Sequence, residues 1–370
     1  MTTYISTRGS DTPKSFEQVL LAGMASDGGL YVPQNWPKLP KLQSASYVET
    51  AFAVMKPFVG DAIPDADFKN IIDQTYGPQI FDHPSITPLV QIADDLWIME
   101  HFRGPTLAFK DVALQLLGRL FDYVLEKRGQ RITIVGATSG DTGSAAIEAC
   151  KACKNIDIFI LHPKDRVSEV QRRQMTTNIA PNVHNIAMEG DFDDCQAMVK
   201  ALFADEEFRN EVKLSAINSI NWARIMAQIV YYVTTSLALG GPERAISYSV
   251  PTGNFGNVLA AYAAKQMGWN IGRLIVASNR NDILTRFFES GSMALEKTRP
   301  SLSPSMDIQI SSNFERVLFD LTGRDSGALK TLMDDFKNTG RFTVPQALLE
   351  AARAQFLSHR CDDEATLQTI

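Results

Sequence analysis

The sequence predicts an α/β protein built on a mostly parallel, doubly wound sheet. From about residue 90, short runs rich in β-branched residues alternate with amphipathic helical stretches, which is the order that produces parallel sheets. Glycine loops follow two of the strands, and such sheets bind ligands beyond the carboxyl ends of their strands. No period of 20–50 residues repeats, which excludes solenoids and propellers. The 370 residues suggest two or three domains.

The N-terminal part predicts helices and one short strand. Residues 15–33 predict a helix, a glycine break and a strand that ends at Pro33. Residues 46–77 predict two more helices, of which the second begins near Pro64 and ends at Gly77.

The alternating part begins with a helix that carries an apolar stripe through Val112, Leu116 and Leu120 and stops at Gly129. Strands are then expected at residues 131–136, 157–161, 183–187, 245–250 and 273–278, and helices at about 143–152, 192–205, 219–239 and 257–267.

Charge and hydropathy exclude several classes of function. The net charge of −6 lacks the basic footprint of a protein that binds nucleic acid or anionic membranes. No stretch approaches the ~18 apolar residues of a membrane span, and the N-terminus has no signal-peptide pattern. We therefore expect a cytoplasmic protein without nucleic-acid or membrane partners.

Four cysteines and five histidines offer no metal site by their spacing. Cys150 and Cys153 form a C-x-x-C, but they lie at the end of a helical pattern rather than at its start, where a redox pair is expected. A zinc site would need a second close pair, which Cys195 and Cys361 do not make. We expect helix-packing cysteines.

The clearest local motif is Pro251-Thr-Gly-Asn-Phe-Gly-Asn257, between a predicted strand and a predicted helix. Glycines let the backbone approach a ligand, and the free N–H groups at a helix start attract an anion. The motif therefore favours phosphate binding over a bare strand-to-helix turn. It is neither a Walker loop nor G-x-G-x-x-G.

A second loop, Gly136-Ala-Thr-Ser-Gly-Asp-Thr-Gly143, also precedes a helix. Its hydroxyl and N–H groups could hold a carboxylate. Asp141 alone is better interpreted as the N-cap of that helix. Two anion-binding loops fit a ligand with two acidic groups, or a cofactor phosphate together with a substrate carboxylate.

Lys110 follows Leu107-Ala-Phe109 at the start of the amphipathic helix. A lysine there is usually a solvated charge, which the helix dipole disfavours. The apolar residues before it would instead desolvate the amine, lower its pKa and let it form a Schiff base. Composition alone leaves both interpretations open.

Six segments resemble the threonine synthases, which are fold-type II pyridoxal-phosphate (PLP) enzymes. They occur in the family's order, cover nearly the whole chain, and are Tyr4-Ile-Ser-Thr-Arg-Gly9, Asp27-Gly-Gly-Leu-Tyr-Val-Pro33, Gly104-Pro-Thr-Leu-Ala-Phe-Lys-Asp111, Gly136-Ala-Thr-Ser-Gly-Asp-Thr-Gly143, Asn218-Ser-Ile-Asn-Trp-Ala-Arg224 and Thr252-Gly-Asn-Phe-Gly-Asn257. The implied fold has two doubly wound, mostly parallel sheet domains and an N-terminal helical extension.

The resemblance implies roles for these residues. Lys110 would carry PLP and move protons at the substrate's carbon atoms. The cofactor phosphate would bind Gly253, Asn254, Phe255, Gly256 and Asn257. The substrate's α-carboxylate would bind Thr138, Ser139, Gly140 and Thr142. Asp141 occupies the position of a contact to the PLP 3′ oxygen, where many such enzymes have asparagine. The substrate's phosphate would bind Ser219, Asn221, Arg224 or Arg166, unless these form a capped helix start and solvated basic residues.

The implied reaction converts O-phospho-L-homoserine and water to L-threonine and phosphate. The alternatives are a related phospho-lyase that releases 2-oxobutyrate and a non-catalytic homologue. The sequence leaves a monomer or a homodimer open.

The resemblance also divides the chain into three regions. We expect an N-terminal region at 1–90, a smaller α/β domain with Lys110 at 91–215 and a larger α/β domain with the phosphate loop at 216–370. The last segment, from Asp362, begins like a capped helix, whereas family members continue further. We therefore expect the larger domain to lack its C-terminal end, together with the residue that faces the PLP pyridine nitrogen.

Overall fold

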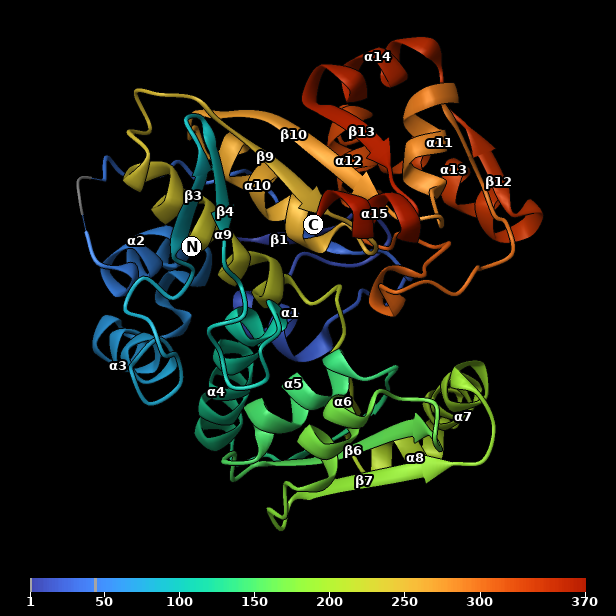
Figure 1. Ribbon diagram of the computed structural model, residues 1–370. Coiled ribbons are helices and arrows are strands. Elements are labelled where there is room, and N and C mark those ends of the chain that lie inside the picture. The colour runs from blue at the N-terminus through green and yellow to red at the C-terminus, as the bar shows by residue number, and fades with distance from the viewer. Residues whose placement is uncertain (1, 43–44) are drawn as a thin grey trace. The chain divides into compact units, whose positions relative to one another are not determined.

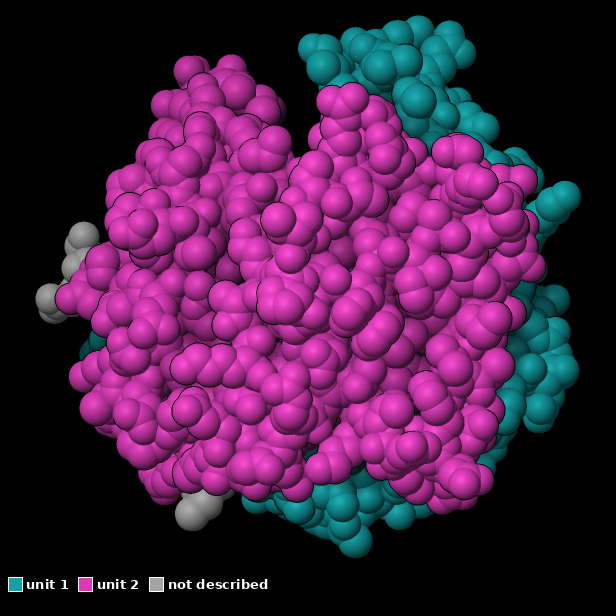
Figure 2. All heavy atoms as spheres, turned by 90° about the horizontal axis from the view of Figure 1, so that it is seen from below, with its two compact units in different colours: residues 1–19, 24–44, 232–370 teal, residues 20–23, 45–231 magenta. Residues whose placement is uncertain are grey.

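A computed structural model describes residues 2–42 and 45–370, and its elements confirm the predicted α/β class (Figure 1). Residues 1 and 43–44, which fall within the predicted region 1–90, lie outside the described residues. Two compact units make up the described chain (Figure 2). Among the described residues, unit 1 consists of residues 2–19, 24–42 and 232–370, and unit 2 of residues 20–23 and 45–231.

Unit 2 contains a four-stranded sheet in the order β7-β6-β5-β8, and all of its strand pairs are parallel. Its strands are β5 (Ile132–Ala137), β6 (Ile156–Pro163), β7 (Val183–Met188) and β8 (Leu214–Ser215). Ala137 pairs with Leu161, so the loops that follow β5 and β6 leave the same edge of the sheet. A separate hairpin joins β3 (Leu89–Ala93) and β4 (Leu96–Met99).

The helices of unit 2 include the predicted amphipathic helix that stops at Gly129. They are α2 (Tyr47–Val59), α3 (Asp65–Thr75), α4 (Lys110–Arg128), α5 (Asp141–Cys150), α6 (Glu169–Thr176), α7 (Phe192–Ala204) and α8 (Glu206–Glu211), with a 3-10 turn at Gly60–Ala62. The apolar stripe of α4 is buried, and Gly129 ends the helix with a left-handed φ of 60°. Cys195 of α7 packs in a core cluster with Val135 and Leu161 of the sheet.

The C-x-x-C pair lies at the end of α5, and both residues are buried. The thiol of Cys153 donates to Gly118 O at 3.5 Å and to Ala149 O at 3.6 Å. Its hydrogen bond with Cys150 and burial raise the pKa of the Cys150 thiol, the opposite of what a reactive thiol needs. The helix-packing interpretation therefore agrees with these contacts.

Unit 1 contains the second parallel sheet, in the order β13-β10-β9. Its strands are β9 (Ile246–Pro251), β10 (Ile271–Ser278) and β13 (Phe356–Arg360), and two antiparallel pairs join β1 (Tyr4–Ser6) with β2 (Tyr31–Pro33) and β11 (Ser292–Ala294) with β12 (Arg341–Thr343). Its helices are α10 (Gly256–Gln266), α11 (Ile283–Ser290), α12 (Phe314–Leu321), α13 (Ser326–Thr339), α14 (Gln346–Gln355) and α15 (Asp363–Thr369), with a 3-10 turn at Pro304–Met306. Two of the boundaries between the units fall within helices, in α1 (Phe16–Ala22) and in α9 (Trp222–Ala238).

The compact units have other bounds than the three predicted regions. Residues 2–19 and 24–42 pack with the last part of the chain, and residues 45–90 pack with the lysine-bearing part. The division at 90 and 215 stays a prediction about domains. Among the described residues, no helix combines the length and the apolar character needed to cross a bilayer.

Candidate active site

Lys110 is the first residue of α4 and is 9% exposed. Its Nζ donates a hydrogen bond to Oδ2 of Asp141, at the start of α5. Burial lowers the pKa of the Lys110 amine, and the neighbouring carboxylate of Asp141 opposes that shift. The desolvation that the apolar residues before Lys110 predict is therefore present in the structure.

Hydrogen bonds from Asp111 and from α6 fix the conformation of the loop before Lys110. Asp111 is fully buried and accepts hydrogen bonds from the backbone N of Thr106 at 2.8 Å and from its Oγ1 at 2.7 Å. Gln174 of α6 donates to Thr106 O at 2.9 Å. Leu107, between these contacts, has a φ of 59°, a conformation that a leucine keeps only where its surroundings impose it. These contacts fix the position from which the lysine side chain starts.

Asp141 is not the N-cap of α5, which corrects the interpretation made from the isolated motif. The N-cap residue is Gly140, and it makes no side-chain cap hydrogen bond. The Asp141 carboxylate accepts from Lys110 Nζ and, at 2.8 Å, from the N–H of Thr142. The local pattern could not reveal this pair, because the lysine lies 31 residues away in the chain.

The loop between β5 and α5 presents N–H groups to an anion. Thr138 is buried, and its Oγ1 accepts from the N–H of Gly140 at 3.0 Å and of Gly143 at 2.8 Å. In the described part of the chain, the N–H groups of Ser139 and Asp141 make no hydrogen bond. Gly140 has a φ of 141°, and a Cβ there would lie 1.9 Å from Gln171 Oε1, so the loop requires glycine.

Arg224, in the first turn of α9, is a buried cation, with only 4% of its surface exposed. Burial lowers the pKa of its guanidinium to about 10, against the attraction of Asp141. Arg224 in turn lowers the pKa of Lys110. Within the described residues, Arg224 Nε has no hydrogen-bond partner. An unpaired buried guanidinium is costly, and an anionic ligand would supply the missing acceptor.

The other candidates for binding the substrate's phosphate differ in their surroundings. Asn221 is fully buried, and its amide is engaged in the fold, donating to Leu20 O at 2.8 Å and accepting from the N–H of Ala223 at 3.0 Å. These contacts favour its interpretation as a helix cap. Ser219 is half-buried just before α9. Arg166 is exposed in the loop after β6.

The glycine loop of unit 1 links β9 to α10. The N–H groups of its residues 253–256 make no hydrogen bond among the described residues. The carbonyl groups of Gly253 and Asn254 accept hydrogen bonds from Ser311 and Asn313, on the opposite side of the peptide planes. Phe255 has a φ of 62° and is held between the rings of Phe314 and Phe356. Main-chain N–H groups arranged in this way at a helix start can bind an anion.

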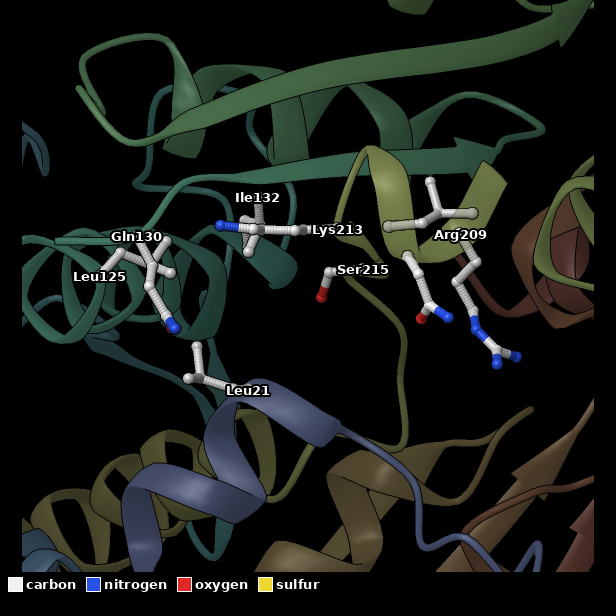
Figure 3. A pocket seen from close by; sticks show the side chains of 9 residues that line it. Leu21, Leu125, Gln130, Ile132, Arg209, Lys213 and Ser215 are labelled. Carbon is white, nitrogen blue, oxygen red and sulfur yellow. The ribbon is translucent and has the colours of Figure 1, made fainter. Parts of the chain in front are cut away.

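A hollow of about 280 Å³ in unit 2 lies away from these groups. Ile132, the first residue of β5, lines it, whereas the Asp141 loop follows the last residue of that strand. Figure 3 shows the polar ends of Arg209 and Lys213 pointing in opposite directions. The hollow therefore presents no convergent set of charges, and its lining consists of Leu21, Leu125, Gln130, Ile132, Arg209, Asn210, Lys213, Leu214 and Ser215.

Unit 2 has a desolvated lysine at the start of a helix, and unit 1 has main-chain N–H donors at the start of another helix. Each is a kind of group that can bind part of pyridoxal phosphate. The lysine can form the covalent link, and the main-chain donors can bind the phosphate dianion. The fold and these sites define a PLP-dependent enzyme of fold type II. A family model described as "Pyridoxal-phosphate dependent enzyme" matches residues 80–335, and one described as "Threonine synthase N terminus" matches residues 3–76.

Known relatives identify the family within this class. The threonine synthase of Pseudomonas aeruginosa is 58% identical over 99% of this chain and 79% of its own length. The PLP-bound crystal structure of threonine synthase from Brucella melitensis has a TM-score of 0.98 and 52% identity, over 100% of this chain and 80% of that one. The yeast threonine synthase structure has a TM-score of 0.95 and 41% identity, over 100% and 78% of the two chains. This chain belongs to the threonine synthase family.

Proposed function

We propose that the chain is a PLP-dependent enzyme that converts O-phospho-L-homoserine and water to L-threonine and phosphate. Membership of the family supports the reaction. The observation that carries the proposal is the buried Lys110–Asp141 pair. The guanidinium of Arg224, whose Nε has no hydrogen-bond partner among the described residues, is close enough to lower the pKa of Lys110. This arrangement offers an amine with a lowered pKa together with a buried cation whose Nε has no hydrogen-bond acceptor among the described residues.

The proposal assigns proton transfer and cofactor attachment to Lys110. An amine must be neutral to attack a carbonyl group or to accept a proton, and burial favours the neutral form of Lys110. Asp141 is proposed as the group that receives the hydrogen bond of Lys110 Nζ and thereby orients the amine. When bound, PLP supplies an electron sink that stabilises negative charge on neighbouring substrate carbons.

The anionic groups of cofactor and substrate are proposed to bind three different features. Residues Gly253, Asn254, Phe255, Gly256 and Asn257 take the cofactor phosphate through their main-chain N–H groups. The loop Thr138–Thr142 takes the substrate's α-carboxylate, for which the free N–H groups of Ser139 and Asp141 are suited. Arg224 is our preferred ligand for the substrate's phosphate because its burial makes an anion favourable there. Ser219 and Arg166 remain secondary candidates, and the engaged amide of Asn221 makes it the weakest.

We further propose that the enzyme acts in the cytoplasm as a monomer or homodimer. The free cysteines of the described chain are compatible with a reducing compartment.

The test is to incubate the PLP-loaded protein with O-phospho-L-homoserine and to measure threonine, phosphate and 2-oxobutyrate in the same sample. We expect threonine and phosphate in equal amounts, with little 2-oxobutyrate. Loading with PLP is verified beforehand from the cofactor's absorbance, and Lys110→Ala serves as the matched inactive control.

The two alternatives have different products. A phospho-lyase of this family would release phosphate together with 2-oxobutyrate, and that result would replace the proposed reaction. A non-catalytic homologue would bind PLP but release no phosphate above the rate of the Lys110→Ala control.

A further inference from the structure

Two carbonyl oxygens of the Gly253–Asn257 loop accept hydrogen bonds from one neighbouring segment, which contains Ser311 and Asn313. Ser311 Oγ donates to Gly253 O at 2.6 Å. Asn313 donates twice to Asn254 O, from its backbone N at 3.1 Å and from its side-chain Nδ2 at 3.0 Å. No motif in the sequence marked Ser311 or Asn313 as functional, because the segment resembles an ordinary helix start.

These contacts determine where the loop's N–H groups point. A trans peptide is planar, so the carbonyl of one residue and the N–H of the next point in opposite directions. Holding Gly253 O and Asn254 O on one side therefore turns the N–H groups of Asn254 and Phe255 to the other side. Those N–H groups belong to the set that makes no hydrogen bond in the described part of the chain.

Asn313 is itself oriented by a buried arginine. Arg316 is 1% exposed, and its Nη1 donates to Asn313 Oδ1. An amide has its acceptor and donor at opposite ends, so this contact leaves Nδ2 for Asn254 O. Asn313 occupies the N-cap position of α12 but makes no side-chain cap hydrogen bond. Its side chain therefore serves the loop rather than the helix.

Arg316 also connects this segment to the N-terminal strands. Its Nε donates to Tyr31 O in β2 at 2.9 Å. Burial lowers the pKa of Arg316 to about 9, so the side chain stays cationic at neutral pH. One guanidinium thus fixes the amide of Asn313 and the backbone of β2.

We propose that Asn313 is a positioning residue for the cofactor phosphate, fixed in turn by Arg316. The proposal rests on the proposed role of Gly253–Asn257 as the phosphate cradle. Phe255 has a φ of 62°, which a phenylalanine adopts only when its surroundings hold it there. Without the side-chain donor of Asn313, only the backbone N–H of residue 313 holds Asn254 O, so the following peptide can rotate and its N–H leaves the cradle.

The test compares pyridoxal phosphate with pyridoxal, which lacks the phosphate group. The apo protein is titrated with each compound, and binding is followed by absorbance. We expect the unmodified chain to bind pyridoxal phosphate more tightly. Asn313→Ala should weaken that binding about tenfold, the size expected from losing one buried hydrogen bond, here the one from Asn313 Nδ2 to Asn254 O. It should leave the affinity for pyridoxal unchanged. The ³¹P resonance of the bound cofactor should also move.

Three further variants separate positioning from a general loss of structure. Asn313→Asp keeps the size and the arginine partner but turns a carboxylate towards Asn254 O, so it should bind pyridoxal phosphate no better than Asn313→Ala. Ser311→Ala removes the independent hydrogen bond to Gly253 O and should also weaken the binding of pyridoxal phosphate. Trp36→Phe removes the 2.8 Å hydrogen bond to Asp320 in α12, so it should lower stability without changing the preference for pyridoxal phosphate.

Each result has a defined consequence. If Asn313→Ala weakens the binding of both compounds equally, or lowers only the melting temperature, then Asn313 has a structural role and the inference is wrong. If that variant does not fold, Asn313→Asp decides by the same comparison, because it keeps the size of the side chain and its arginine partner. If the unmodified chain itself binds both compounds equally, the assignment of the cradle fails, which is a failure of the proposed function and not of the Asn313 contacts.

Discussion

At the scale of single residues, two opposite influences act on the pKa of Lys110. Burial and the nearby guanidinium of Arg224 lower the pKa of its amine, whereas the carboxylate of Asp141 raises it. Burial is the largest cause, so the net direction is downward. The neutral amine is the nucleophile, and the rate at which the apo protein takes up PLP should therefore rise with pH through the Lys110 pKa.

We predict that Asp141→Asn moves this inflection to lower pH. The substitution removes the negative charge that favours the protonated amine, so the neutral form persists under more acidic conditions. The measurement is the initial rate of PLP uptake by the apo protein at a series of pH values. Arg224→Gln is the matched control of opposite sign: it removes a nearby positive charge and should move the inflection to higher pH. Shifts of the same sign in both variants would contradict this electrostatic account.

At the scale of elements, α4 and α5 pack closely together at Gly118. A Cβ added there would lie 2.6 Å from the carbonyl oxygen of Ala149, which is backbone and cannot move aside. Lys110 is the first residue of α4, and Asp141 is the first residue of α5. The close approach therefore helps to set the relative position of the two charged side chains.

We predict that Gly118→Ala destabilises the protein although alanine is the better helix former. Helix propensity favours alanine by ~1 kcal/mol, but overpacking at a rigid contact typically costs about 1–3 kcal/mol. The expected net effect is a melting temperature lowered by a few degrees, at roughly 2–4 °C per kcal/mol for units of this size. Thermal unfolding followed by circular dichroism provides the measurement.

Gly327→Ala is the control for that experiment. Gly327 lies in the first turn of the exposed helix α13, and an added Cβ would approach only Asp325 Oδ1, at 3.3 Å. This variant should keep or raise the melting temperature. A Gly118→Ala protein as stable as the Gly327→Ala protein would show that the two helices can separate without cost.

At the scale of the whole molecule, the sequence predicts the class of fold better than its connections. The period of apolar residues locates α4, and β-branched runs locate β5, β6, β7, β9 and β10. Leu214–Ser215 is a strand only because it pairs with Thr133 and Ile134, and two residues contain no periodic signal. Phe356–Arg360 joins the sheet of unit 1 from a distant part of the chain. Strand order and the composition of the two units depend on such distant pairings.

The same limit applies to the sites. Lys110, Arg224 and the two anion-binding loops are recognisable because each lies in a contiguous motif. The Lys110–Asp141 pair, the unpaired Nε of Arg224 and the support of Asn254 by Asn313 depend on packing between segments far apart in sequence. The local pattern therefore predicts a helix cap at Asp141 and contains no signal for Asn313.

The most direct test of the central claim is to find where the cofactor attaches. The purified protein is loaded with PLP, reduced with borohydride, digested, and its peptides are mapped by mass spectrometry. We predict one labelled peptide, modified at Lys110, and no label in a Lys110→Ala protein that keeps the same circular dichroism spectrum. A label on any other lysine, or none in the unmodified chain, would contradict the assignment of Lys110 and with it the proposed function.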